Sequence, residues 1–188
     1  MKRIALFASG SGSNVENIIR YFSNSIELDF PFVISNRSEA YVHERAKSLR
    51  VPSYFFRKDD FENGEVLKFL QEGKIDMIVL AGFLLKIPDN ILKAYPDRVI
   101  NIHPALLPKF GGKGMYGSHV HKAVVESGET ETGITIHFAN ENYDEGRIIF
   151  QAACQVFPDD SPDDVAAKVH ALEHEHFPRV VGEVASNI

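Results

Sequence analysis

Two polar side chains lie at the end of one short apolar stretch near the middle of the chain. Asn101 and His103 are interleaved with the run Val99–Ile102, which is typical of a buried parallel strand. Pro104 follows and ends the strand, because proline lacks a backbone donor. Strand residues two apart face the same side, and ligands of open α/β sheets bind beyond the carboxyl ends of the strands. We therefore predict that an amide and an imidazole point together into a ligand site, rather than forming a polar strand end satisfied by backbone.

The chemistry open to this pair is proton transfer with electrostatic stabilisation. An asparagine amide can donate to an oxyanion, and a histidine can move a proton or stabilise negative charge. A nearby carboxylate would favour the imidazolium form and orient the ring. Asp144, in the turn 140–146, is the candidate, although an aspartate in such a turn is also an ordinary turn former. No candidate nucleophile accompanies the set, so we expect no covalent intermediate.

A glycine-rich loop near the amino terminus predicts a phosphate site. The strand Arg3–Phe7 leads into Ser9–Asn14 and a helix over 14–22, which would aim free N–H groups and a helix dipole at an anion. The loop lacks the lysine of NTPase phosphate loops, and Val15 replaces the third glycine of the dinucleotide fingerprint. A single phosphate fits better than NAD, and a simple tight turn is the alternative.

Two further loops border the predicted sheet edge. The segment 81–88 follows the apolar strand Ile75–Leu80 and is unusually apolar for a loop, so it is either core or the wall of a pocket for a flat ligand. The glycine-rich segment Phe110–Gly117 is typical of a mobile lid.

The rest of the chain alternates strand and helix patterns, which predicts one α/β domain over 1–188 with helices packed on a mainly parallel sheet. Ser118 and Ser161 are expected to cap helices. Helices are predicted over 40–49, 61–71, 89–94, 118–127 and 161–184, and strands over 32–34, 51–56, 133–138 and 148–156.

Histidine patterns invite a metal interpretation that we do not adopt. Residues 170–174 match H-x-x-E-H, and His119/His121 and His174/His176 add pairs. A zinc site needs a further ligand at the right place, and a solvated or substrate-facing helix side explains the pattern more simply. We predict no metal.

Composition limits the function classes. The net charge of −6 argues against a dedicated partner among nucleic acids or anionic membranes. The lone Cys154 excludes an internal disulfide and favours a reducing compartment. No apolar run resembles a signal peptide or a membrane span, so we expect a cytoplasmic protein acting on small molecules, as a monomer or homodimer.

Three motifs together resemble one family over nearly the whole chain. Ile100–Lys109, which reads INIHPALLPK, closely resembles the NIHPSLLPK segment of folate-dependent formyltransferases. Gly133–Gly146 resembles their second signature, which closes on an aspartate and a glycine-containing turn. The loop Ser9–Asn14 and the chain length favour the members that formylate glycinamide ribonucleotide in purine biosynthesis.

The resemblance implies a seven-stranded, mainly parallel sheet with helices on both faces. It also implies direct transfer of a formyl group from the co-substrate 10-formyltetrahydrofolate to the glycinamide amine, without a metal. Asn101 would hold the formyl oxygen, His103 would transfer protons, and Asp144 would raise the pKa of His103 and order water. The N-terminal half would bind the ribonucleotide, and the C-terminal half would bind folate and carry out catalysis.

The resemblance also implies binding residues. For the ribonucleotide these are Gly12, Ser13 and Asn14 at the phosphate, with Glu173 on the last helix. For folate they are Leu84, Leu85, Lys86 and Ile87 around the pterin, Asn101, and Lys58 or its neighbour Arg57 at the tail. One departure is Phe110–Gly117, which is longer than the usual link after the first motif.

Two other functions remain open on the sequence. A relative of the same chemistry could use water or a sugar nucleotide as acceptor. A non-catalytic phosphate or nucleotide sensor could share the scaffold, since a fold does not fix function. The set Asn101, His103 and Asp144 argues against the sensor, which has no need of it.

Overall fold

One mixed sheet runs through the molecule, and the computed structural model describes all of residues 1–188. Its main path follows the order β4-β3-β1-β5-β6-β7-β8, and a two-residue strand, β2, pairs with β1 outside this path. The pairs from β4 to β6 are parallel, while β6–β7 and β7–β8 are antiparallel. The predicted seven-stranded, mainly parallel sheet is confirmed. The strands are β1 (Lys2–Phe7), β2 (Leu28–Asp29), β3 (Val33–Ser35), β4 (Ser53–Phe55), β5 (Met77–Leu80), β6 (Val99–His103), β7 (Glu131–Phe138) and β8 (Ile148–Gln155).

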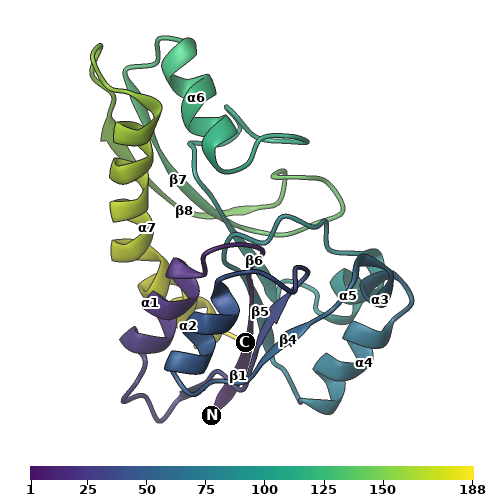
Figure 1. Ribbon diagram of the computed structural model, residues 1–188. Coiled ribbons are helices and arrows are strands. Elements are labelled where there is room, and N and C mark those ends of the chain that lie inside the picture. Colours follow the sequence, from purple (N-terminus) through teal and green to yellow (C-terminus); the bar gives the residue numbers. More distant parts are fainter.

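Helices cover both faces of the sheet (Figure 1). They are α1 (Ser13–Tyr21), α2 (Val42–Ser48), α3 (Lys58–Glu62), α4 (Glu65–Glu72), α5 (Asp89–Ala94), α6 (Ser118–Glu126) and α7 (Pro162–Ala185). The alternation of β1 divides the core, because successive strand residues point to opposite faces. Ile4 and Leu6 pack into the core that includes residues of α1, α2, α6 and α7. Ala5 and Phe7 pack into the second core, beside residues of α3, α4 and α5.

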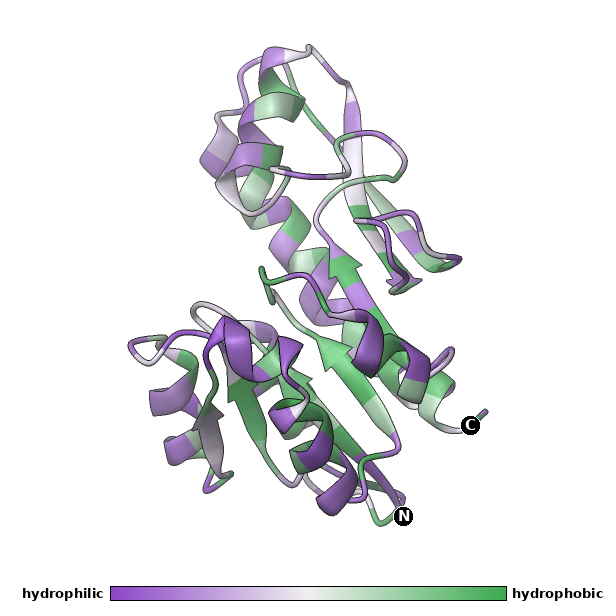
Figure 2. Ribbon diagram, turned by 90° about the vertical axis from the view of Figure 1, so that its right-hand side faces the viewer, coloured by the Kyte–Doolittle hydropathy of each residue, from purple (hydrophilic) through white to green (hydrophobic).

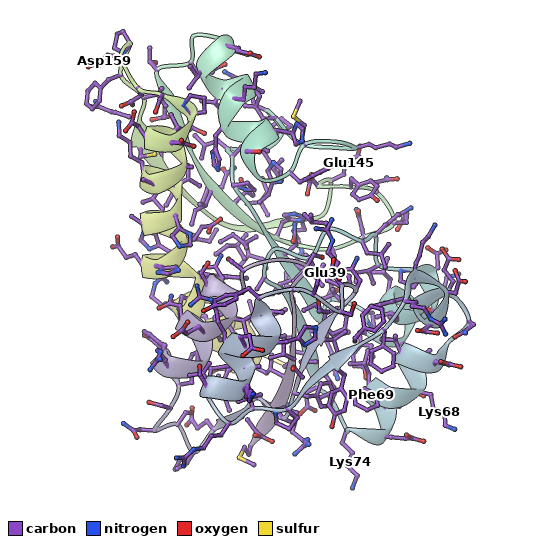
Figure 3. The ribbon with its side chains drawn as sticks, viewed as in Figure 1. Glu39, Lys68, Phe69, Lys74, Glu145 and Asp159 are labelled. Carbon is purple, nitrogen blue, oxygen red and sulfur yellow. The ribbon has the colours of Figure 1, made fainter.

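The distribution of apolar residues follows this layered arrangement. The central strands are strongly hydrophobic, whereas the helices carry a hydrophilic side (Figure 2). Phe69 of α4 stacks on Phe32, Tyr54 and Phe56, which closes the second core beside the edge strand β4. Charged side chains such as Lys68 project from the periphery (Figure 3). None of the helices combines the length and apolar character needed to cross a membrane.

Two predicted helix boundaries were wrong. The predicted helix 61–71 is two helices, α3 and α4, because Gly64 adopts φ 92° between them, a conformation that a continuing helix excludes. Ser118 is the first residue of α6 rather than its cap, and Gly117 occupies the cap position without a side-chain hydrogen bond. By contrast, Ser161 caps α7 as predicted, with its hydroxyl accepting from the Asp164 N–H.

Candidate functional site

A cavity of about 620 Å³ opens at the carboxyl ends of the central strands. Its volume lies in the usual range for small-molecule sites, about 300–1,000 Å³. Its wall combines the glycine-rich loop, the apolar loop after β5, the end of β6, the segment after it, the end of β7 with the turn that follows, and one residue each of α6 and α7. Of the predicted site residues, those that line it are Gly12, Ser13, Asn14, Leu84, Leu85, Lys86, Ile87, Asn101, His103, Asp144 and Glu173.

The three predicted catalytic side chains meet at one end of this cavity. Asn101 and His103 lie in β6, and β7 runs antiparallel beside it before the chain turns through Asp144. The His103 Nδ1 atom lies 3.5 Å from the Asp144 Oδ2 atom. The tertiary structure therefore closes the gap in sequence between the imidazole and the carboxylate.

His103 is enclosed, with its side chain 4% exposed. Its Nε2 atom lies 2.7 Å from the carbonyl oxygen of Phe110. Burial lowers the pKa of His103, and the opposing effects of Asp144 and of the Phe110 carbonyl do not compensate. Asp144 raises this pKa, as the resemblance implies, but the net direction is downward because burial has the larger effect. Desolvation is the larger effect, so the resting imidazole is neutral.

Asp144 stays ionised although it is partly enclosed. Burial raises the pKa of Asp144. Contacts with His137, His103 and the N–H of Gly112 lower it, and together they outweigh burial, so the net direction is downward. The Gly112 N–H donates to Oδ2 over 3.0 Å. The carboxylate also lies 3.6 Å from the His137 Nε2 atom, so one anion faces two imidazoles.

His137 belongs to this cluster, and the sequence analysis did not identify it. It sits directly opposite Asn101 in the β6–β7 register. Its Nδ1 atom lies 2.9 Å from the Phe138 carbonyl, to which it can donate, and its Nε2 atom lies 3.1 Å from the Asn101 amide nitrogen. The ring therefore accepts from Asn101 and orients that amide. A strand over 133–138 was predicted, but only its pairing register with β6 could have identified His137.

A glycine allows the close approach beside His137. A Cβ atom on Gly146 would lie 1.6 Å from the Phe138 carbonyl oxygen. The chain returning from the turn could not pass there with a larger residue. The β7–β8 pairing also shifts register between Ile136 and His137, which re-aims the strand at the cavity.

Thr135 holds the segment that follows β6. Its hydroxyl donates to the Ala105 carbonyl over 2.7 Å and accepts from the Leu107 N–H over 3.0 Å. Thr135 pairs with His103 in the register, so the chain is fixed directly after the catalytic strand. These hydrogen bonds fix the position of the backbone that follows His103.

The glycine-rich loop forms another part of the cavity wall. Gly12 precedes α1 with φ 72°, and a Cβ there would lie 2.3 Å from the Val42 Cγ2 atom. Only glycine therefore fits the turn that presents the first N–H groups of α1 to the cavity. Asn14 donates from Nδ2 to the Glu173 Oε2 atom over 2.9 Å, which joins α1 to α7.

His170 of α7 contacts Glu173, which is the residue of this helix that lines the cavity. The His170 Nδ1 atom lies 3.1 Å from the same Oε2 atom of Glu173. Hydrogen bonding to Glu173 raises the pKa of His170. The ring of His174 stacks on that of His170 at 4.1 Å between centroids. No group of three or more His, Cys, Asp or Glu side chains is arranged to bind a metal ion.

The apolar loop after β5 is a wall of the cavity, and one serine holds it in place. The Ser9 hydroxyl accepts from the Leu84 N–H over 2.8 Å and donates to Asn36 Oδ1 over 2.6 Å. Phe83 packs edge-on against Phe7 below the loop. The Leu84 side chain is 39% exposed, as expected of an apolar side chain that a bound apolar ligand would cover.

Lys58 lies apart from the other predicted site residues. It begins α3, its side chain is 67% exposed, and it pairs with Glu62 at 3.4 Å. The neighbouring Arg57 faces Asp60 at 3.8 Å. Neither residue lines the cavity, so a role in binding requires a ligand that extends beyond the cavity wall.

The segment Phe110–Gly117 takes part in the site. Residues 112–117 line the cavity, the Phe110 carbonyl lies beside His103 Nε2, and the Gly112 N–H donates to Asp144. It is therefore built into the environment of His103 and Asp144. Its motion as a lid stays a prediction.

Comparison with known proteins identifies the family of the chain. Residues 2–181 match the family described as "Formyl transferase". The chain is 42% identical over 190 residues to "Phosphoribosylglycinamide formyltransferase, chloroplastic" of Arabidopsis thaliana, covering 97% of this chain and 65% of that protein. It is 35% identical to "Phosphoribosylglycinamide formyltransferase" of Haemophilus influenzae, covering 96% of this chain and 86% of that protein. The crystal structure of phosphoribosylglycinamide formyltransferase from Streptococcus pneumoniae superposes with a TM-score of 0.86 at 36% identity, over 98% of this chain and 99% of that one.

Proposed function

Because the chain belongs to the formyl transferase family, we propose that it transfers the formyl group of 10-formyltetrahydrofolate to the amine of 5′-phosphoribosylglycinamide. The products are the N-formyl ribonucleotide and tetrahydrofolate, as in de novo purine (IMP) biosynthesis. The observation that carries the proposal is the meeting of Asn101, His103 and Asp144 in a cavity whose other end is a phosphate-type loop. The names of relatives such as the Haemophilus influenzae enzyme support the choice of acceptor.

Asn101 stabilises the negative charge that develops during transfer. When the amine attacks the formyl carbon, the formyl oxygen becomes an oxyanion, and an amide N–H aimed at it lowers the barrier. His137 fixes the amide by accepting one of its hydrogens at 3.1 Å. The second N–H of Asn101 is free for the formyl oxygen.

His103 moves the proton that must leave the attacking amine. Its lowered pKa leaves a neutral imidazole whose Nε2 donates to the Phe110 carbonyl, so Nδ1, beside Asp144, is the nitrogen that can accept this proton and pass it to the folate nitrogen that loses the formyl group. Asp144, held ionised by its contacts, stabilises the imidazolium while it exists. The carbon–nitrogen bond to the acceptor forms, the bond to folate breaks, and the proton changes nitrogen.

The two substrates occupy the two parts of the cavity. Gly12, Ser13 and Asn14 bind the phosphate, and Glu173 accepts from hydroxyl groups of the ribose. The wall Leu84–Ile87 encloses the pterin, and Lys58 meets the folate tail outside the cavity. We propose that the reaction uses no metal. We also predict that the N-terminal half binds the ribonucleotide and the C-terminal half binds folate, that the protein is cytoplasmic, and that it is a monomer or a homodimer.

One assay tests the proposal. Purified protein is incubated with 10-formyltetrahydrofolate, with and without the ribonucleotide, and release of tetrahydrofolate is followed. Release that depends on the ribonucleotide and survives EDTA supports the proposal. Release without any acceptor indicates a hydrolase, and ligand-induced stabilisation without turnover indicates a sensor. Activity lost in EDTA and restored by zinc contradicts the metal-free mechanism.

A further inference from the structure

One histidine of the cavity wall has no role in the mechanism above. His121 lies in α6, is 8% exposed and lines the cavity. Its Nδ1 atom is enclosed by protein and has no hydrogen-bond partner. A buried polar atom without a partner is uncommon in a folded protein and calls for an explanation.

The enclosed atom fixes where the ring carries its proton. A buried N–H without an acceptor is rarer and costlier than a buried lone pair without a donor. Nδ1 is therefore the unprotonated nitrogen, and the proton of the neutral ring is on Nε2. Because Nδ1 is enclosed while the ring lines the cavity, Nε2 is the nitrogen directed at a ligand.

The surroundings of the ring keep it neutral. Burial lowers the pKa of His121, and this effect exceeds the opposing attraction of Glu173 on α7, while the nearby His103 of β6 acts in the same direction as burial. A second proton would also create an unpaired N–H at Nδ1. The ring is thus harder to protonate than a free imidazole, and at neutral pH it is a single donor.

The position of His121 indicates which ligand atom it meets. Its charged and titratable neighbours are Glu173 at the ribonucleotide end and His103 at the catalytic end. In the proposed substrate, the group between the ribose and the reacting amine is an amide, whose carbonyl oxygen accepts hydrogen bonds. We propose that His121 is a ribonucleotide-binding residue that donates from Nε2 to this carbonyl oxygen; this inference rests on the proposed function.

Three variants of His121 test the donor. His121→Leu removes it and is expected to raise KM for the ribonucleotide about five- to tenfold, the effect of one neutral hydrogen bond, with a smaller change in kcat. His121→Gln places an amide nitrogen near the Nε2 position and is expected to restore most of the affinity. His121→Asn places its amide nitrogen near Nδ1 instead and is expected to resemble the leucine variant. KM for 10-formyltetrahydrofolate should stay constant in all three.

A matched control lies on the same helix. His119 is exposed and packs against Tyr116, outside the cavity lining, so His119→Leu should leave KM unchanged. Equal KM values for the wild type and His121→Leu, or equal rescue by glutamine and asparagine, would overturn the inference while leaving the proposed function intact. A wild type without ribonucleotide-dependent release would instead refute the proposed function.

Nitrogen NMR of the histidine rings tests the proton position without turnover. In the free protein at neutral pH, the His121 ring should show a protonated Nε2 and an unprotonated Nδ1, and it should take up its second proton at a lower pH than the exposed His119 does. Addition of the ribonucleotide should shift the Nε2 signal. A ring protonated on Nδ1, or on both nitrogens at neutral pH, contradicts the inference.

Discussion

Two histidine–carboxylate pairs lie at or beside the cavity: His103 and Asp144 both line it, whereas of His170 and Glu173 only Glu173 does. His103 faces Asp144 at 3.5 Å, and His170 faces Glu173 at 3.1 Å. The chemical groups are the same, yet the pKa of His103 is lowered and that of His170 is raised. The difference in environment is large, since the side chain of His103 is 4% exposed and that of His170 is 46% exposed.

The comparison shows that burial, rather than the presence of a carboxylate, decides the charge of each ring. At the catalytic end, desolvation outweighs the attraction of the anion, which leaves a neutral imidazole able to accept a proton. At the ribonucleotide end, solvent reduces the desolvation penalty, so the hydrogen bond to Glu173 dominates. The buried pair is suited to proton transfer, and the exposed pair is suited to holding a carboxylate in place for binding.

The largest expected effect follows from removing the buried imidazole. His103→Ala should lower kcat by about 10²–10⁴-fold, because the proton relay is lost, with a much smaller change in KM for the ribonucleotide. Steady-state kinetics at saturating folate measures this, with the exposed His119→Ala as control. A kcat within about threefold of the wild type would remove His103 from the mechanism.

A slightly smaller loss is expected from the oxyanion donor. Asn101→Ala should lower kcat by about 10²–10³-fold, the usual effect of removing one such hydrogen bond. Asn101→Asp, measured in parallel, keeps the size of the side chain but replaces the amide with an acceptor, and should be no more active than the alanine variant. Near-normal turnover in either variant would show that the formyl oxygen is stabilised elsewhere.

At the ribonucleotide end the effect should appear in KM. Glu173→Gln removes a charged acceptor, which is expected to raise KM for the ribonucleotide by about ten- to a hundredfold, from the loss of roughly 1.5–3 kcal/mol. The change in kcat should be smaller, because Glu173 makes no hydrogen bond to His103 and is the weakest of the electrostatic influences that act on that ring. Initial rates at varied ribonucleotide decide this. A loss confined to kcat would contradict the division of the cavity into two ends.

The smallest effect concerns the pH dependence of stability. Because the pKa of His170 is raised in the folded state, its contact with Glu173 stabilises the fold fully below the unfolded pKa of about 6.5, and this contribution is lost as the pH rises through the higher folded value. His170→Gln should therefore lower the free energy of unfolding in mildly acidic solution and have no effect at about pH 9. The ring is nearly half exposed, so solvent screening keeps the difference below about 1 kcal/mol.

Urea denaturation of both proteins at several pH values measures this contribution. His103 has the opposite sign, since its lowered pKa means that the unfolded state binds the proton more readily, and stability falls as the pH drops below about 6.5. His103→Gln should reduce this acid-side loss, so the two variants should change the pH profile in opposite directions. Changes of the same sign would break the comparison.

Much of the catalytic end could be predicted from local rules. Asn101 and His103 share a strand face because strand side chains alternate, and Pro104 ends that strand. The same rules could not supply His137, because its place opposite Asn101 depends on the pairing register of two strands distant in sequence. The break at Gly64 was also missed, although residues 62–65 read Glu-Asn-Gly-Glu and an Asn-Gly pair is itself a local turn signal.

The sequence by itself determined the mainly parallel sheet, the glycine-rich turn before α1 and the family, because these depend on residue order, periodicity and short motifs. Only the tertiary structure decided which of the predicted residues share a cavity, which leaves Lys58 outside it. It also decided the direction of each histidine's pKa, from His103 to His170. The physical reason is that burial and contact depend on how distant segments pack, and desolvation can reverse the effect of a charge whose presence the sequence already shows.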